Sequence, residues 1–223
     1  MRMRKKKHLE QRLEQGAQKN IFVYRSDNLN FADDTDKTYI DLVGYFGRTA
    51  PVQMEVGCGK GGFITKLAQL HPEIDYIAVE YCANVIVTAA EAAQELGIKN
   101  VLFVNANAEY LTRLIPANSI GRIYLNFSCP FPKKKYACHR LTNSRFLDIY
   151  RTLMTEDAAI FQKTDNRPFF DYSIEQFEQS GFELSNVTFD LANSGYEGNI
   201  MTEYEQRFTS MGVPICRLEA RGK

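Results

Sequence analysis

Short apolar runs alternate with segments of helical periodicity along most of this chain. Each run is about the length of a buried strand, and the runs lie at residues 52–57, 75–80, 101–106, 120–127 and 158–164. Apolar side chains recur at the three- and four-residue spacing of an amphipathic helix at residues 60–70, 83–96, 142–155 and 169–181. Alternating strands and helices predict an α/β fold with a mostly parallel sheet that is covered by helices on both faces.

The two ends of the chain depart from this alternation. Residues 1–20 are polar and basic and predict an N-terminal arm, whereas residues 21–223 are expected to form a single domain. Within that domain, residues 21–50 predict a loosely helical lead-in. Residues 182–191 and 214–220 predict a final pair of strands with less helix between them, so we expect an antiparallel strand at the end of the chain.

The charge of the chain is balanced in total but uneven along its length. The 223 residues are 44% hydrophobic and 24% charged, with a formal net charge of zero, so no global field attracts a polyanion. Basic residues gather in the first twelve positions, MRMRKKKHLEQR, and in a second block made of Lys133, Lys134, Lys135, His139, Arg140, Arg145 and Arg151. Such local blocks can contact nucleic-acid phosphates, although a solvated surface explains either block equally well.

The cysteines indicate a reducing environment. The chain has five of them, with no C-x-x-C pair, at Cys58, Cys82, Cys129, Cys138 and Cys216. This pattern argues against a disulfide framework and against a metal site, so we expect no metal. The basic N-terminus is not followed by the apolar stretch of a signal peptide, and no run of about 18 apolar residues exists to span a membrane. The expected location is therefore cytoplasmic, with no membrane partner.

The first apolar run ends in a glycine loop, EVGCGKGG, at residues 55–62. Gly57, Gly59 and Gly62 fit the G-x-G-x-x-G pattern of a dinucleotide site, with Glu80 near the place of the acid that binds ribose. The same letters, from Glu55 to Gly61, fit the E-x-G-x-G loop of class I S-adenosylmethionine methyltransferases, which they resemble.

The chemistry of the two cofactors favours S-adenosylmethionine. A pyrophosphate needs backbone N–H groups at a helix N-terminus, and Glu55 would be poorly placed beside it. S-adenosylmethionine instead carries an ammonium, a sulfonium and a ribose, for which Glu55 and Glu80 are suitable partners. The Asn107 amide can meet the adenine edge. The dinucleotide site and a tight turn without a ligand remain the alternatives at this point.

Further motifs resemble one family along nearly the whole chain and in the same order. They are EVGCGKGGFI at 55–64, NFS-x-P-x-PKK…RLT at 126–142, FQKTDN at 161–166, GNIMTEYE at 198–205 and PI-x-R at 214–217. Together they are similar to the bacterial tRNA (guanine-N7)-methyltransferases. The resemblance implies a class I, Rossmann-like fold and methylation of guanine N7 at position 46 of the tRNA variable loop. It also implies S-adenosylmethionine as cofactor, S-adenosylhomocysteine as product, tRNA as partner, and a monomer or homodimer.

The resemblance also implies roles for individual residues. The cofactor positions are Glu55, Gly57, Gly59, Glu80, Asn107 and Cys129. The substrate positions are Lys133, Asp165, Thr202, Glu203, Tyr204 and Glu205. Cys129 and Asp165 match the catalytic positions, and RNA contact is implied for Lys134 and Lys135. The basic charge of Arg140 predicts that it contacts the tRNA backbone together with these lysines.

Three positions depart from the usual residues of the family. Cys129 occupies the slot of an Asp, Phe131 replaces a Trp, and Asn107 stands where an acid is common. Guanine N7 carries a free lone pair and needs no base, so a carboxylate at position 129 would orient a group and not remove a proton. We therefore predict that the protein is an active methyltransferase. The alternatives are a weakly active or inactive tRNA-binding paralogue, or an enzyme that methylates another acceptor.

Overall fold

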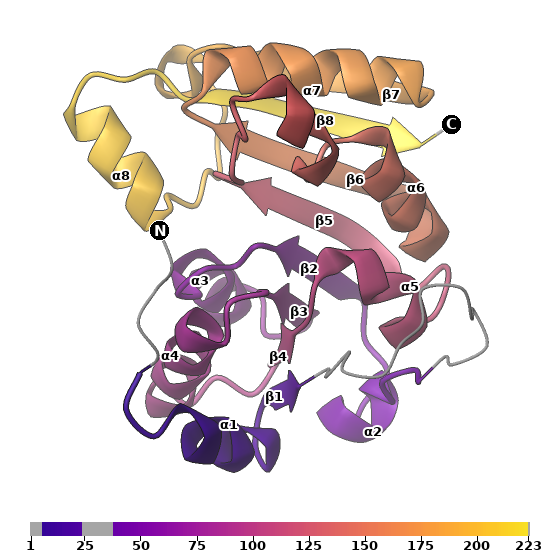
Figure 1. Ribbon diagram of the computed structural model, residues 1–223, viewed down its shortest axis with the longest axis vertical. Coiled ribbons are helices and arrows are strands. Elements are labelled where there is room, and N and C mark those ends of the chain that lie inside the picture. Colours follow the sequence, from indigo (N-terminus) through magenta and orange to yellow (C-terminus); the bar gives the residue numbers. More distant parts are fainter. Residues whose placement is uncertain (1–5, 24–37, 223) are drawn as a thin grey trace. The chain divides into compact units, whose positions relative to one another are not determined.

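The computed structural model describes residues 6–23 and 38–222 of the chain (Figure 1). The chain divides into two compact units, Met1–Pro116 and Ala117–Lys223, and each unit is described here by itself. The division into an arm over 1–20 and one domain over 21–223 stays a prediction. Among the described residues, no helix is long and apolar enough to cross a membrane.

The first unit contains four parallel strands in the order β1-β4-β3-β2. The bounds of these strands are Ile21–Val23 (β1), Val52–Val56 (β2), Asp75–Val79 (β3) and Val101–Asn105 (β4). β2, β3 and β4 lie in the predicted runs. The helical prediction was wrong for β1, which pairs with β4 through its backbone and carries too few residues to show a strand pattern. A short helix, α2 (Leu42–Phe46), does occur in that lead-in, and residues 24–37 lie outside the described residues.

Helices α1 and α4 pack together in this unit. The helix bounds are Leu9–Ala17 (α1), Gly62–Leu70 (α3), Ala83–Glu95 (α4) and Leu111–Leu114 (α5), with a 3₁₀ turn at Ala108–Tyr110 (η1). α4 buries small side chains such as Ala89 and Ala93, which allow a close approach to its neighbours. α1 buries Leu9 and Leu13, and the Arg12 Nε donates to the Glu91 Oε1 on α4 at 2.7 Å. The described part of the predicted arm is therefore folded against α4.

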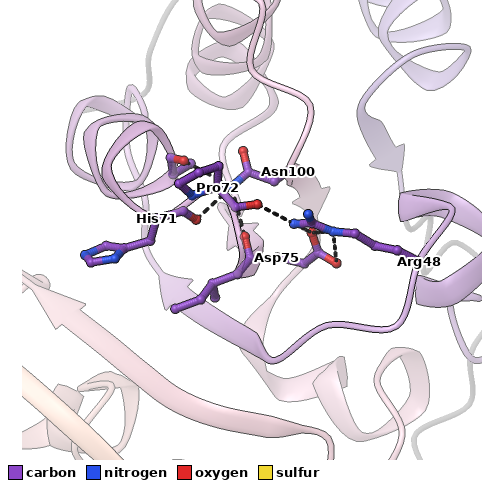
Figure 2. Close-up of polar contacts among 7 residues, drawn as sticks. Arg48, His71, Pro72, Asp75 and Asn100 are labelled. Atoms are coloured by element: carbon purple, nitrogen blue, oxygen red, sulfur yellow. Dashed lines mark hydrogen bonds and ion pairs between the residues drawn. The ribbon is translucent and has the colours of Figure 1, made fainter.

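Polar side chains close the amino-terminal edge of this sheet (Figure 2). Asp75 begins β3 and is 1% exposed, and the Arg48 Nη2 contacts its Oδ1 at 2.6 Å. The same nitrogen donates to the Pro72 carbonyl at 2.7 Å. The Asn100 Nδ2 donates to the carbonyls of Ala68, His71 and Ile74. These contacts fix the entry into β3 at the edge opposite the glycine loop.

The second unit contains strands in the order β5-β6-β8-β7. The bounds are Ile120–Asn126 (β5), Met154–Thr164 (β6), Phe182–Thr188 (β7) and Cys216–Gly222 (β8). β5 and β6 are parallel, whereas β8 runs antiparallel to both β6 and β7. The predicted antiparallel strand at the end of the chain is thus confirmed.

The helices of this unit follow the strands much as the periodicity predicted. They are α6 (Ser144–Leu153), α7 (Arg167–Gln179) and α8 (Glu203–Ser210), with 3₁₀ turns at Lys134–His139 (η2) and Leu191–Asn193 (η3). Phe146, Leu147 and Tyr150 on α6 and Phe169, Phe170 and Phe177 on α7 are buried. The strand ends that carry the predicted acceptor residues are therefore built on a packed aromatic core.

Candidate active-site residues in the two units

Glu80 follows β3 and ties the glycine loop to the start of α4. Its Oε2 accepts a hydrogen bond from the Gly59 N–H at 3.2 Å, and its Oε1 accepts one from the Cys82 N–H at 2.8 Å. The N–H groups of Gly57 and Cys58 both donate to the Val79 carbonyl. Because β2 and β3 are parallel, the loop after one and the acid after the other lie at the same edge. The predicted grouping of Gly57, Gly59 and Glu80 is present.

Two glycines in this loop are required for different reasons. Gly59 has φ +57°, and a Cβ built there meets no atom within 4 Å. Gly61 has φ +79°, and a Cβ there would lie 3.0 Å from the Ala89 Cβ and 3.3 Å from the Phe103 Cε1. The left-handed backbone alone favours glycine at position 59. Position 61 also needs the space, because the loop lies directly against α4 and β4.

Negative charge gathers around the loop. Glu55 on β2 is 2% exposed, and Cys58 is buried two residues beyond the end of that strand. Burial raises the pKa of the Cys58 thiol well above its usual value, and the charges of Glu55 and Glu80 raise it further. Both carboxylates therefore act at the loop, where their field suits a cation and opposes a pyrophosphate.

Two asparagines lie at the end of β4: Asn105 is its last residue and Asn107 comes two residues later, and the sequence analysis identified only the second. The Asn105 Nδ2 donates to the carbonyls of Glu80 and Tyr81 at 2.8 and 3.0 Å, which fixes the backbone on which the Glu80 side chain is mounted. The polar end of an apolar run was the available signal for it. The Asn107 Oδ1 caps η1 by accepting from the Glu109 N–H at 3.2 Å. An amide oxygen can accept a second hydrogen bond, so this cap leaves the predicted contact with adenine open.

In the second unit, the parallel strands β5 and β6 bring Cys129 and Asp165 to one edge of the sheet. The Phe127 N–H donates to the Lys163 carbonyl at 2.8 Å, and the Cys129 side chain is exposed two residues further on. Asp165 comes directly after β6. Burial raises the pKa of Cys216, the first residue of β8, to about 11; Arg167 lowers it in part, and Asp165 is among the carboxylates that raise it.

The TEYE run divides into two pairs of residues. Thr202 and Glu205 form the capping box of α8, in which the Thr202 Oγ1 accepts from the Glu205 N–H at 2.9 Å. Glu205 is 2% exposed, and its Oε2 lies 2.7 Å from the Lys163 Nζ. Glu203 and Tyr204 are exposed on the outside of the same helix turn. Of the four predicted substrate residues in this run, two thus build the helix start and two face solvent.

Lys163 was missed in the sequence analysis. Besides Glu205, its Nζ donates to the Asn199 Oδ1 at 3.1 Å and to the Ile200 carbonyl at 2.9 Å. Asn199 in turn donates to Glu205. This buried cluster holds the segment before α8 against the end of β6. A lysine inside an apolar run was its signal, since a buried ammonium requires a partner.

An aromatic surface lies beside the end of β5. The rings of Phe127, Tyr204 and Phe208 are nearly parallel, with centroids 6.1 to 6.4 Å apart. Tyr204 is 58% exposed. We call these three side chains the aromatic cluster. Its exposed ring is chemically suited to stack on a nucleobase.

The basic residues after this strand differ in their surroundings. Lys133, Lys134 and Lys135 are exposed at the start of η2. Arg140 is half-buried, and its guanidinium donates to the carbonyls of Pro130 and Phe131. Among the residues that the structure describes, no group of three His, Cys, Asp or Glu side chains is arranged to hold a metal ion.

Comparisons with known proteins agree with one family. A family model described as "Putative methyltransferase" matches residues 49–218. Proteins called tRNA (guanine-N(7)-)-methyltransferase are similar to this chain: that of Lachnoclostridium phytofermentans is 48% identical, covering 78% of this chain and 82% of that protein, and that of Macrococcus caseolyticus is 42% identical, covering 90% and 94%. The Bacillus subtilis protein of that name is 45% identical over 78% of this chain and 82% of its own length.

Solved structures agree on the fold. The 16S rRNA methyltransferase KamB superposes with a TM-score of 0.60 at 16% identity, covering 88% of this chain and 97% of that one. An antibiotic-related methyltransferase gives a TM-score of 0.60 at 18% identity, covering 87% and 95%. The predicted class I, Rossmann-like methyltransferase fold is confirmed. The chain belongs to the tRNA (guanine-N7)-methyltransferase family.

Proposed function

We propose that this protein transfers the methyl group of S-adenosylmethionine to N7 of the guanine at position 46 in the tRNA variable loop. Its relatives at 42–48% identity carry the name of that activity, which supports the choice of acceptor. The structural observation that carries the proposal is the glycine loop of the first unit, which the Glu80 carboxylate holds and which lies in the field of Glu55.

The residues around that loop fit the proposed cofactor. S-adenosylmethionine supplies an electrophilic methyl group on a positively charged sulfur, and its aminoacyl end carries an ammonium. Glu55 and Glu80 raise the pKa of the neighbouring Cys58 thiol, so the local potential is negative and favours cations. We assign Glu80 to the ribose hydroxyls, Glu55 to the ammonium, and Asn107 to the adenine edge. Gly57 and Gly59 carry no side chain, so the backbone of the loop can come close to the cofactor.

The second unit offers groups for the acceptor. The exposed Tyr204 ring of the aromatic cluster can stack on a guanine that leaves its base stack. Asp165 can accept hydrogen bonds from guanine N1–H and the exocyclic amine, and the exposed Glu203 can share that task. Thr202 and Glu205 hold Tyr204 in place through the α8 cap. We assign Lys133, Lys134 and Lys135 to contacts with tRNA phosphates.

The chemistry asks mainly for alignment. Guanine N7 presents its lone pair in the plane of the base, so no proton has to leave before it attacks the methyl group. Holding nucleophile and methyl group in line can supply about 7–11 kcal/mol of the barrier reduction. The tasks of this chain are therefore to bind the two partners, to orient the base and to keep its edge fixed.

Cys129 sets the expected strength of the activity. Replacing a carboxylate by a thiol removes a charged hydrogen-bond acceptor, which is typically worth about 1.5–3 kcal/mol. That loss corresponds to a rate roughly 10- to 100-fold lower than with Asp at this position. A weakly active or inactive tRNA-binding paralogue is the second candidate, and the exposed Cys129 in place of Asp is the observation that favours it.

Transfer of a radiolabelled methyl group to unmodified tRNA tests the proposal. We expect labelled N7-methylguanosine, and we expect the label to disappear when guanine 46 is replaced by adenine. Binding of both S-adenosylmethionine and tRNA without transfer would favour the paralogue. Transfer that survives the replacement would indicate another acceptor.

The Cys129→Asp variant separates the two candidates further. If position 129 orients a substrate group, restoring the carboxylate should raise the rate roughly tenfold or more, since one charged hydrogen bond returns. Cys138→Asp is the matched control, because Cys138 is also an exposed thiol near the lysines. An unchanged or lower rate in Cys129→Asp would remove our account of this position.

Location and assembly belong to the same proposal. All five cysteines are free thiols in the structure, which supports a reducing compartment such as the cytoplasm. A monomer or homodimer is proposed, with tRNA as the partner.

A further inference from the structure

Arg140 forms hydrogen bonds with the segment that follows β5. We call this segment, residues 127–133, the acceptor segment. The Arg140 Nε donates to the Pro130 carbonyl at 2.9 Å, and its Nη2 donates to the Phe131 carbonyl at 3.0 Å. One guanidinium therefore satisfies two successive carbonyls. This use of the planar fork is specific to arginine.

The acceptor segment has an unusual backbone. Phe127 and Phe131 have φ values of +51° and +39°, which lie in a left-handed region that residues other than glycine rarely adopt. Such conformations cost free energy and persist only where the surroundings determine them. Pro130 and Pro132 restrict the backbone on either side of Phe131. The bonds from Arg140 to Pro130 and Phe131 add a further constraint at this point.

Arg140 is itself held by the helices of the second unit. Its guanidinium lies over the Tyr172 ring on α7, 4.2 Å from the ring centroid. The Tyr172 hydroxyl accepts from the Asn143 Nδ2 at 2.8 Å, and Asn143 is the N-cap of α6. The acceptor segment is thus connected to two packed helices through Arg140, Tyr172 and Asn143.

We propose that Arg140 is a positioning residue for methyl transfer: it holds the acceptor segment, and with it Cys129, in a defined shape, and it does not serve as a tRNA phosphate contact. This inference rests on the proposed function, and it replaces the RNA contact that the basic charge of Arg140 predicted. Two nitrogens of its guanidinium, Nε and Nη2, donate to protein carbonyls and the side chain is half-buried, whereas Lys134 and Lys135 are exposed for phosphate.

Two substitutions separate the roles. Arg140→Lys keeps the charge but cannot bond two carbonyls in a fork, so a positioning role predicts a kcat about 10- to 100-fold lower with KM for tRNA nearly unchanged. A phosphate role predicts a kcat close to that of the wild type. Arg140→Gln removes the charge; a positioning role predicts that the salt dependence of tRNA binding keeps its slope. A lost phosphate contact would reduce the slope by about one.

Lys134→Gln is the matched control for the binding measurement. It removes one charge from an exposed position six residues away, and we expect its salt slope to fall by about one. Tyr172→Leu removes the ring beneath the guanidinium and leaves every basic residue in the sequence. Its kcat should be lower than that of the wild type, as in Arg140→Lys. An unchanged kcat in Arg140→Lys, or a reduced salt slope in Arg140→Gln, would overturn the proposal.

Hydrogen exchange distinguishes a failure of this inference from a failure of the proposed function. Because it needs no methyl transfer, it can be measured on the protein alone. In Arg140→Lys, the amides of the acceptor segment should exchange faster, while those of β6 and α7 stay protected. Unchanged exchange would sink the positioning role even if the wild type methylates tRNA. Faster exchange would support the part of the proposal in which Arg140 holds the segment, and an inactive wild type would then count against the proposed function and not against this hold.

Discussion

The glycine loop after β2 and the acceptor segment after β5 both turn the chain at the carboxyl end of a parallel strand, but they are shaped by different means. In the glycine loop, backbone N–H groups bond to Glu80 and to the Val79 carbonyl, and glycines take the left-handed conformations. In the acceptor segment, phenylalanines take these conformations, and the side chain of Arg140 bonds to the backbone.

This difference bears on function. The glycine loop lies beside the carboxylates of Glu55 and Glu80, and the cofactor proposed for it is the same small molecule in every reaction cycle. The acceptor segment carries exposed side chains, which the proposed function brings into contact with a large polyanion. Because the backbone of the acceptor segment is held by Arg140, a residue outside it, the side chains of the segment remain available for that contact. The comparison predicts that the two regions respond differently to reagents and to substitution.

The largest contrast should appear in thiol labelling. Cys58 lies buried in the glycine loop, where burial and the charges of Glu55 and Glu80 raise its pKa, whereas Cys129 in the acceptor segment is exposed. Alkylation requires the thiolate, and a raised pKa keeps Cys58 protonated to higher pH. With iodoacetamide, peptide mapping should show Cys129 fully labelled while Cys58 in the native protein is unmodified. Equal labelling of the two thiols would contradict the buried, acidic loop.

Substitutions at two glycines should sharpen the picture of the loop. Gly61→Ala combines a left-handed backbone with a Cβ that lies 3.0 Å from the Ala89 Cβ, so we expect the free energy of unfolding to fall by about 2–4 kcal/mol. Gly59→Ala has the same backbone strain and open space, and should cost about 1–2 kcal/mol. Thermal and urea unfolding measure both. Equal losses would show that the contact with α4 contributes nothing.

The same contrast explains what could be predicted from the sequence. Glycines and an acid at fixed spacing predict the turn after β2, because few residues other than glycine tolerate the left-handed backbone of that turn. At Phe127 and Phe131 the left-handed conformations leave no such signal, since long-range contacts from Arg140 and from the strands determine them. The alternation of apolar runs predicted β2 to β6, whereas the pairing of the three-residue β1 with β4 had no local pattern.

Residue type alone does not decide between the uses that one side chain can have. Basic character predicts that Arg140 contacts RNA, and the structure adds that its guanidinium bonds to carbonyls of its own chain. Within TEYE, the T-x-x-E spacing of Thr202 and Glu205 is the signature of a capping box, which the sequence analysis did not use. The exposure of Tyr204 has no such signal in the letters and comes from the structure. In this run, the residues that build the helix start and the residues proposed to bind the substrate are therefore direct neighbours in the sequence.

Glu80→Gln tests the charge at the glycine loop. The amide keeps one acceptor but loses the negative charge proposed for the ribose hydroxyls, so the Kd for S-adenosylmethionine should rise about 10- to 100-fold. Isothermal titration calorimetry measures it. Glu95→Gln makes the same chemical change at an exposed position of the first unit and should leave the Kd unchanged. A Glu80→Gln protein with wild-type affinity would exclude Glu80 from the cofactor site.

Asn100→Ala should give the smallest effect, and it tests whether function is confined to one edge of the first sheet. The Asn100 Nδ2 bonds to three carbonyls at the amino-terminal edge, at 3.1, 3.3 and 2.9 Å (Figure 2). Removing it leaves these acceptors to water or unpaired, at a cost of about 1–2 kcal/mol, or a few degrees in Tm.

Affinity for S-adenosylmethionine, measured well below that Tm, should not change in Asn100→Ala, because the residues proposed to bind the cofactor lie at the opposite ends of β2, β3 and β4. Lys99→Ala, an exposed neighbour, controls for the loss of a polar side chain and should keep both Tm and affinity. If Asn100→Ala weakened cofactor binding as strongly as Glu80→Gln, the two edges of the sheet would be coupled. The glycine loop would then depend on the whole of the unit, and not only on Glu80 and the backbone bonds beside it.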